Sequence, residues 1–158
     1  EISLLKSFIE EFKIKAYRSP AWLRTKKMYK ILSRFFSYDL SCLDNDPFSL
    51  TGNGGVGLVR PFMFESGLIE LPCNLLFESP VYWGVPAANL LDYWKPKIKF
   101  VEHFKGMLLI TTHPDRNYLG NSKMLAAYER LLGFLADKNW KSMLPRDLEN
   151  NCRDKGPS

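Results

Sequence analysis

The sequence predicts an α/β fold with a mainly parallel sheet, and two observations carry that prediction. Over residues 2–40, helical and strand patterns alternate in the order helix, strand, helix, strand, which is typical of parallel βαβ units. Further along, the apolar run 107–112 precedes the strongest amphipathic pattern of the chain, at 122–137. A chain of 158 residues has the length of one ordinary domain.

The N-terminal elements follow from the spacing of apolar side chains. Residues 2–13 place apolar side chains on one helical face and charged ones on the other, so we expect an amphipathic helix. A short strand at 14–17 then ends before a proline, which interrupts regular structure. Residues 23–34 return to helical spacing, and residues 35–40 predict the second strand.

The middle of the chain is punctuated by glycine and proline. The glycine-rich stretch 51–57 predicts a long loop, since it lacks the Lys-Ser/Thr pair and the following helix of phosphate-binding loops. Strands are expected at 67–71 and at 75–77. A helix is expected at 87–95, where Pro96 limits it.

The C-terminal part repeats the alternation of strand and helix. The apolar run 107–112 predicts a buried strand, and residues 122–137 carry the clearest helical spacing. Residues 140–144 predict a final short strand, and a proline at 145 opens a helical turn. Residues 150–158 are expected to be a frayed tail.

Composition narrows the classes of protein without selecting one. The formal net charge is +5, the sequence pI is about 9.1, and basic residues gather at 24–34. Such a group is either a nucleic-acid-binding face or the solvated side of a helix. Cys42 and Cys73 lie in apolar stretches and are expected in the core, and no cysteine spacing typical of zinc sites occurs. No apolar run approaches the length of a membrane span.

Three side chains stand where chemistry is expected. His113 follows the predicted strand 107–112, and the carboxyl ends of parallel strands form the binding face of α/β folds. The alternative is that this histidine only hydrogen-bonds a loop. Arg18 follows the first strand and could orient a carboxylate, while Trp22 could form a wall for a sugar ring; a surface arginine and a core tryptophan are the alternative. His103 lies in a polar segment and is expected to face solvent.

The order of these segments resembles the polysaccharide deacetylase superfamily, carbohydrate esterase family four. A helical N-terminus leads to YRSPAW at 17–22, which is similar to the family's third motif, an arginine followed by proline and an aromatic residue. FSYDLS at 36–41 is similar to a family strand, and GLIELP at 67–72 to the strand before the fourth motif. LLITTHP at 108–114 resembles the fifth motif, an apolar strand that ends in histidine.

The resemblance implies a fold and a reaction. The implied fold is α/β, a partial (β/α) barrel of the polysaccharide deacetylase type with a mainly parallel sheet, whose N-terminal strands are missing. The implied reaction is metal-assisted hydrolysis of N- or O-acetyl groups on a carbohydrate, with a divalent, zinc-like metal in the intact domain. Residues 1–149 would form the C-terminal part of such a domain, before the tail at 150–158.

Roles for individual residues come from the same resemblance. His113 would be the acid that protonates the leaving group, and Arg18 would orient the catalytic base. The resemblance also implies four substrate-binding positions, namely Pro20, Trp22, Leu109 and Ile110, the last two as alternatives for lining an acetyl pocket.

The chain also departs from the family's pattern. The paired aspartates of the first motif and the paired histidines of the second have no counterpart, and neither Asp39, Asp44 nor Asp46 occupies the metal position. Since these motifs are missing, we expect no metal bound to this chain alone and no activity. The chain begins at Glu1 and not Met, so we also expect a truncated N-terminus. The expected partner is an acetylated polysaccharide or oligosaccharide, with no nucleic acid and no membrane span. A non-catalytic carbohydrate-binding or structural relative remains the alternative, and a basic nucleic-acid-binding module a lesser one.

Overall fold

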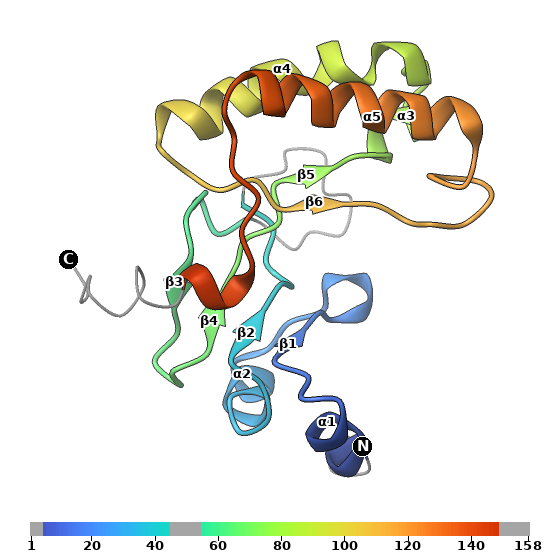
Figure 1. Ribbon diagram of the computed structural model, residues 1–158. Helices are drawn as coiled ribbons and strands as arrows, with labels where there is room; N and C mark the ends of the chain where they lie inside the picture. Colours follow the sequence, from blue (N-terminus) through green and yellow to red (C-terminus); the bar gives the residue numbers. More distant parts are fainter. Residues whose placement is uncertain (1–4, 45–54, 149–158) are drawn as a thin grey trace. The chain divides into compact units, whose positions relative to one another are not determined.

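The computed structural model describes residues 5–44 and 55–148 (Figure 1). The chain divides into two compact units, Glu1–Pro72 with Leu144–Ser158 (the first unit) and Cys73–Met143 (the second unit). Both are small mixtures of helix and sheet. The strands of the described residues form one four-stranded and one two-stranded sheet and no closed barrel, so the implied partial barrel stays a prediction.

The four-stranded sheet belongs to the first unit and has the order β1-β2-β4-β3. Strands β1 (Ala16–Tyr17), β2 (Tyr38–Asp39) and β4 (Ile69–Glu70) are parallel, and β3 (Phe62–Met63) pairs with β4 in the antiparallel sense. The parallel ladder is extended by Leu71 N, which donates to Asp39 O at 2.9 Å. The three parallel strands therefore share one carboxyl end, and polar side chains of β2 and β4 meet there.

Short helices accompany the strands of the first unit. Helix α1 (Lys6–Glu11) buries only Ile9, and a 3-10 turn, η2 (Pro20–Trp22), follows β1. Helix α2 (Lys26–Leu32) begins after Thr25, whose side chain accepts a hydrogen bond from Met28 N at 3.1 Å and so satisfies a free donor of the first turn. The lysines of α2 are exposed, which is compatible with both alternatives for the basic group 24–34, a solvated helix side and a nucleic-acid-binding face.

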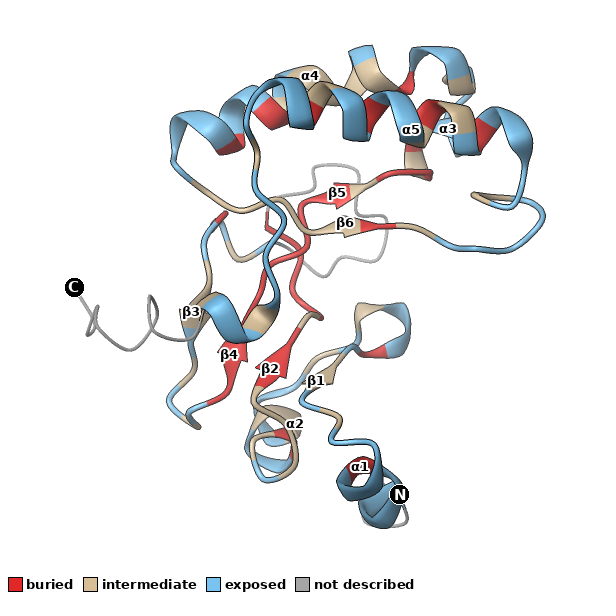
Figure 2. Ribbon diagram, in the orientation of Figure 1, coloured by how far each residue is buried: buried red, intermediate tan, exposed pale blue. Residues whose placement is uncertain are grey.

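The second unit places two long helices over a short parallel sheet (Figure 1). Strand β5 (Leu75–Leu76) pairs with β6 (Ile110–Thr111) in parallel. The helices of this unit are α3 (Ser79–Tyr82), a 3-10 turn η3 (Ala87–Asn89), α4 (Leu90–His103) and α5 (Ser122–Asp137). Figure 2 shows buried positions recurring along α4 and α5 between exposed ones, as amphipathic helices require. The core of the unit is formed by Leu75, Phe77, Leu90, Ile98, Met124, Ala127, Leu131 and Leu135.

Helix α4 corrects the sequence prediction of a helix at 87–95. The helix begins at Leu90 and continues through Pro96 to His103. A proline removes one backbone hydrogen bond, here to the carbonyl of residue 92, and such a loss can be outweighed by burial. Ile98 and Val101 lie beyond the proline and are fully buried. The apolar contacts of the last two turns therefore stabilise the helix past Pro96.

Three further short segments differ from the sequence prediction. Residues 140–144 are irregular and not a strand, because only Trp140 packs on the core and 141–144 are exposed. Strand β3 was not expected; it is brought against β4 by a tight turn in which Gly67 has a φ of 81°. Helix α3 was not expected either; it contains Pro80 in its first turn, where proline is favoured.

Other predictions concern single residues and segments. Cys42 and Cys73 are both 1% exposed, which confirms that they are core residues. His103 is exposed at the end of α4. Within the described ranges no helix has the length and apolar character needed to cross a membrane. Asp46, most of the glycine-rich stretch 51–57 and the tail at 150–158 lie outside the described residues.

Candidate functional site

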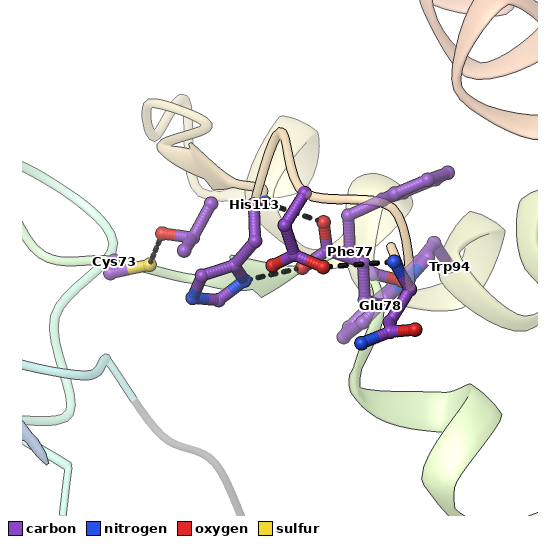
Figure 3. Close-up of polar contacts among 8 residues, drawn as sticks. Cys73, Phe77, Glu78, Trp94 and His113 are labelled. Carbon is purple, nitrogen blue, oxygen red and sulfur yellow. Dashed lines mark hydrogen bonds and ion pairs between the residues drawn. The ribbon is translucent and has the colours of Figure 1, made fainter. Parts of the chain in front are cut away.

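A histidine and a glutamate meet at the carboxyl ends of β5 and β6. His113 Nδ1 lies 2.9 Å from Glu78 Oε2, and the backbone N–H of His113 donates to Glu78 Oε1 at 2.6 Å (Figure 3). Both carboxylate oxygens of Glu78 are therefore engaged by one residue. We call this arrangement the Glu78–His113 pair, and it lies where α/β folds usually carry their sites.

The strand register explains why these two side chains meet. Leu75 pairs with Ile110 and Leu76 with Thr111, and Phe77 N donates to Thr111 O at 3.1 Å. The same register, continued by two residues, sets Glu78 opposite His113. The prediction that His113 follows the end of a strand is confirmed, since β6 ends at Thr111.

The two side chains differ sharply in exposure. The Glu78 side chain is 5% exposed and that of His113 is 57% exposed. A buried carboxylate accepts the Nδ1–H of the ring and fixes its orientation, which leaves Nε2 to exchange a proton with a ligand. A buried acid behind an exposed imidazole is the arrangement used to orient catalytic histidines.

Neighbouring hydrogen bonds hold the strand ends in place. Trp94 Nε1, from α4, donates to Phe77 O at 3.2 Å, directly before Glu78 (Figure 3). Cys73 Sγ lies 2.9 Å from Thr111 Oγ1, which is buried two residues before His113. The Glu78–His113 pair is thus supported by side chains from three segments of the second unit.

Two of the predicted substrate-binding residues also lie in the second unit. Ile110 belongs to β6, and its side chain packs against the core cluster. Leu109 is half-buried, and its backbone N–H donates to Asn74 Oδ1 at 3.0 Å. Their assignment to an acetyl pocket stays a prediction.

The remaining predicted residues lie in the first unit, after β1. The Arg18 guanidinium lies 4.3 Å from the centre of the Trp22 ring, a cation–π contact. Ala21 and Trp22 have φ values of 51° and 57°, a left-handed backbone that costs energy for residues other than glycine. Arg18 and Pro20 are exposed, and Trp22 is half-buried. Arg18 and His113 each follow a parallel strand, but of different sheets, so their sharing one site stays a prediction.

A second polar cluster lies inside the first unit. Asp39 and Glu70 are paired residues on adjacent parallel strands, and both are fully buried. Asp39 Oδ1 accepts a hydrogen bond from Ser41 Oγ at 2.7 Å, and Glu70 Oε1 accepts one from Cys42 N at 2.9 Å. The second oxygens, Asp39 Oδ2 and Glu70 Oε2, are buried and receive no hydrogen bond from any other group within the described ranges. We call this arrangement the Asp39–Glu70 pair.

Two adjacent carboxyl groups in a core cannot both be charged without a large electrostatic cost. Burial, together with the hydrogen bond to Asp39 and the negative charge of Asp39, raises the pKa of Glu70 to about 9. Glu70 is therefore protonated at neutral pH, with one proton held between the two carboxyl groups.

Burial also suppresses ionisation beside this pair. Burial, together with the charge that Glu70 carries above its own pKa, raises the pKa of the Cys42 thiol to about 11. Cys42 Sγ lies 3.4 Å from the hydroxyl of Tyr29, whose pKa is raised by burial as well. These neutral groups form a structural network and not a reactive thiol site.

A divalent metal was expected only for the intact domain, and the described residues do not fit one. No group of three or more His, Cys, Asp or Glu side chains that could hold an ion occurs in 5–44 and 55–148. His113 Nδ1 is engaged by Glu78. Glu70, the nearest acid to Asp39 in the strand register, is neutral.

Sequence reasoning did not find Glu78, Asp39 or Glu70 as site residues. Glu78 follows the expected strand 75–77 as His113 follows 107–112, so the same positional signal was present at both. Glu70 was visible as a single charge inside the apolar stretch 67–72. Searches against protein-family models, curated proteins and solved structures found no match to this chain.

Proposed function

We propose that this chain is part of a carbohydrate deacetylase, in which His113 protonates the leaving nitrogen or oxygen when an acetyl group is hydrolysed. The observation that carries the proposal is the Glu78–His113 pair at the ends of two parallel strands. The order of the motifs at 17–22, 36–41, 67–72 and 108–114 supports the same class of hydrolase.

The proposed proton path uses one ring nitrogen. Glu78 accepts the Nδ1–H, so Nε2 carries the proton that passes to the leaving group as its bond to the acetyl carbon breaks. Water adds to the acetyl carbon, the proton that it loses replaces the one given up by His113, and the products are acetate and a free amine or alcohol. The buried Glu78 carboxylate holds the His113 ring in the orientation that leaves Nε2 toward the leaving group.

Deacetylases of the proposed class also use a divalent metal, which polarises the acetyl carbonyl and a water molecule. Since the described residues do not fit such an ion, we propose that its ligands come from another part of the intact protein. We accordingly expect the 158-residue chain to bind acetylated carbohydrate without releasing acetate.

The test is a titration of the chain with N-acetylchitotetraose and with its deacetylated form, followed by NMR of the histidine Cε1–H signals. We expect a saturable shift of the His113 signal with the acetylated sugar only. His103, exposed on α4, is the internal control and should not move. If the His113 signal is unchanged by acetylated chitin and xylan oligomers alike, the proposal fails. Equal shifts with both forms of the sugar would instead favour the carbohydrate-binding alternative.

A further inference from the structure

A row of aromatic rings continues outward from His113. The Tyr118 ring lies 5.2 Å from the His113 ring, centre to centre, and the Tyr82 ring lies 5.8 Å from that of Tyr118. Tyr82 is 66% exposed, and Tyr118 is half-buried. Neither tyrosine belongs to the core cluster of the unit. Their rings therefore present apolar surface beside the exposed His113.

Both tyrosines are positioned by short, hydrogen-bonded segments. Tyr118 N donates to Asp115 O at 3.1 Å, and Leu119 N donates to His113 O at 3.0 Å, which closes the loop after β6. A Cβ on Gly120 would lie 2.7 Å from Asp115 O, so this turn requires glycine. The loop therefore fixes where Tyr118 stands relative to His113.

Tyr82 is tied to the same site through α3. Glu78, which holds His113, occupies the position directly before this helix, and Val81 N donates to Glu78 O at 3.0 Å. Residues four apart lie on one side of a helix, so Tyr82 stands one turn above Glu78. One residue thus positions both the proposed acid and one ring of the row.

Exposed tyrosine rings next to a polar group suit one class of ligand. A pyranose ring offers C–H faces that pack on aromatic rings and hydroxyl groups that pair with the phenol oxygens. We propose that Tyr82 and Tyr118 form a platform that binds the sugar ring adjacent to the bond at which His113 acts. This tyrosine platform deepens the proposed function and rests on it for the identity of the ligand as a carbohydrate.

The test measures the dissociation constant of N-acetylchitotetraose by NMR for Tyr82→Ala, Tyr118→Ala and Tyr82→Phe. Loss of one ring contact should weaken binding about 3- to 10-fold for each alanine variant. Tyr82→Phe keeps the ring and should stay within about 2-fold of the wild type, given that one hydroxyl contact to water-exposed sugar adds little net energy. The matched control is Phe100→Ala, an aromatic residue of α4 that is 48% exposed and belongs to another ring pair.

The outcomes separate the platform from the proposed function. If His113 responds to the acetylated sugar while both alanine variants keep wild-type affinity, the platform is wrong and the function stands. If the alanine variants weaken binding but acetylated and deacetylated sugars bind equally, the platform stands and the deacetylase function falls. Absence of any oligosaccharide binding, or tighter binding of adenosine monophosphate than of any sugar, overturns the platform. Amide signals of α5 verify that each variant is folded.

Discussion

Replacing Glu70 by glutamine should remove most of the pH dependence of the first unit's stability. The folded protein keeps the buried Glu70 protonated up to a pKa of about 9, whereas the unfolded chain releases that proton near the ordinary value of 4.5. Between these values the unfolded state binds fewer protons than the folded state. The free energy of unfolding therefore falls as pH rises, with a slope of about 1.4 kcal/mol per pH unit from this group.

The magnitude over an accessible range follows directly. From pH 6 to pH 8 the wild type should lose about 3 kcal/mol of stability from this group. Glutamine has the same shape, and its oxygen can still accept the hydrogen bond from Cys42 N. Its amide can donate to Asp39 as the proton did, so Glu70→Gln should hold nearly constant stability over the same range and match or exceed the wild type at pH 8.

The assay is amide hydrogen exchange, corrected for the pH dependence of the intrinsic exchange rate. Leu71 N, bonded to Asp39 O, reports on the first unit, and Phe77 N, bonded to Thr111 O, reports on the second. The control variant is Glu10→Gln, whose exposed carboxylate pairs with Lys6, and it should leave the slope unchanged. The claim that Glu70 and Asp39 share a proton would be refuted if the wild-type free energy of opening at Leu71 stayed constant from pH 6 to pH 8. It would also be refuted if that free energy changed with pH by the same amount in Glu70→Gln.

Three other predictions can be checked with the same protein. Leu131→Ala, at a fully buried position of α5, should cost the second unit about 2–5 kcal/mol, measured by urea unfolding, whereas Leu132→Ala at an exposed position should cost under about 1 kcal/mol. Cys42 and Cys73 should resist iodoacetamide in the folded protein and react once urea unfolds it, as mass spectrometry of the labelled peptides would show; fast labelling of either thiol in buffer would contradict their burial. The chain incubated with zinc or cobalt should release no acetate from acetylated chitin or xylan oligomers; turnover that a chelator and His113→Ala both abolish would mean that a metal site was overlooked.

Sequence reasoning worked best where one local signal acted alone. Helix α5 spans the predicted residues 122–137 because its apolar spacing is regular and Asn121 caps it, its side chain accepting from Lys123 N at 2.9 Å. His113 was located correctly because it follows the apolar run 107–112, within which β6 ends at Thr111. Such signals need no knowledge of the partner segment.

The features that were missed depend on residues far apart in the chain. Glu78 contacts His113, 35 residues further along the chain, and Glu70 pairs with Asp39, 31 residues before it. Only the strand register brings the two members of each pair together. Pro96 does not end α4, because side chains farther along the helix are buried. Local propensity is a weak prior that such tertiary contacts override.

The division of the chain has a consequence for the order in which it folds. The first unit contains both Glu1–Pro72 and the segment from Leu144 onward, so the second unit is an insertion within it. During synthesis all of Cys73–Met143 is made, and leaves the exit tunnel, before the segment that begins at Leu144 emerges. The inserted unit can therefore bury its core while the host unit is still incomplete, and a purified chain that stops at residue 143 should protect its α5 amides from exchange but leave the host open to proteolysis.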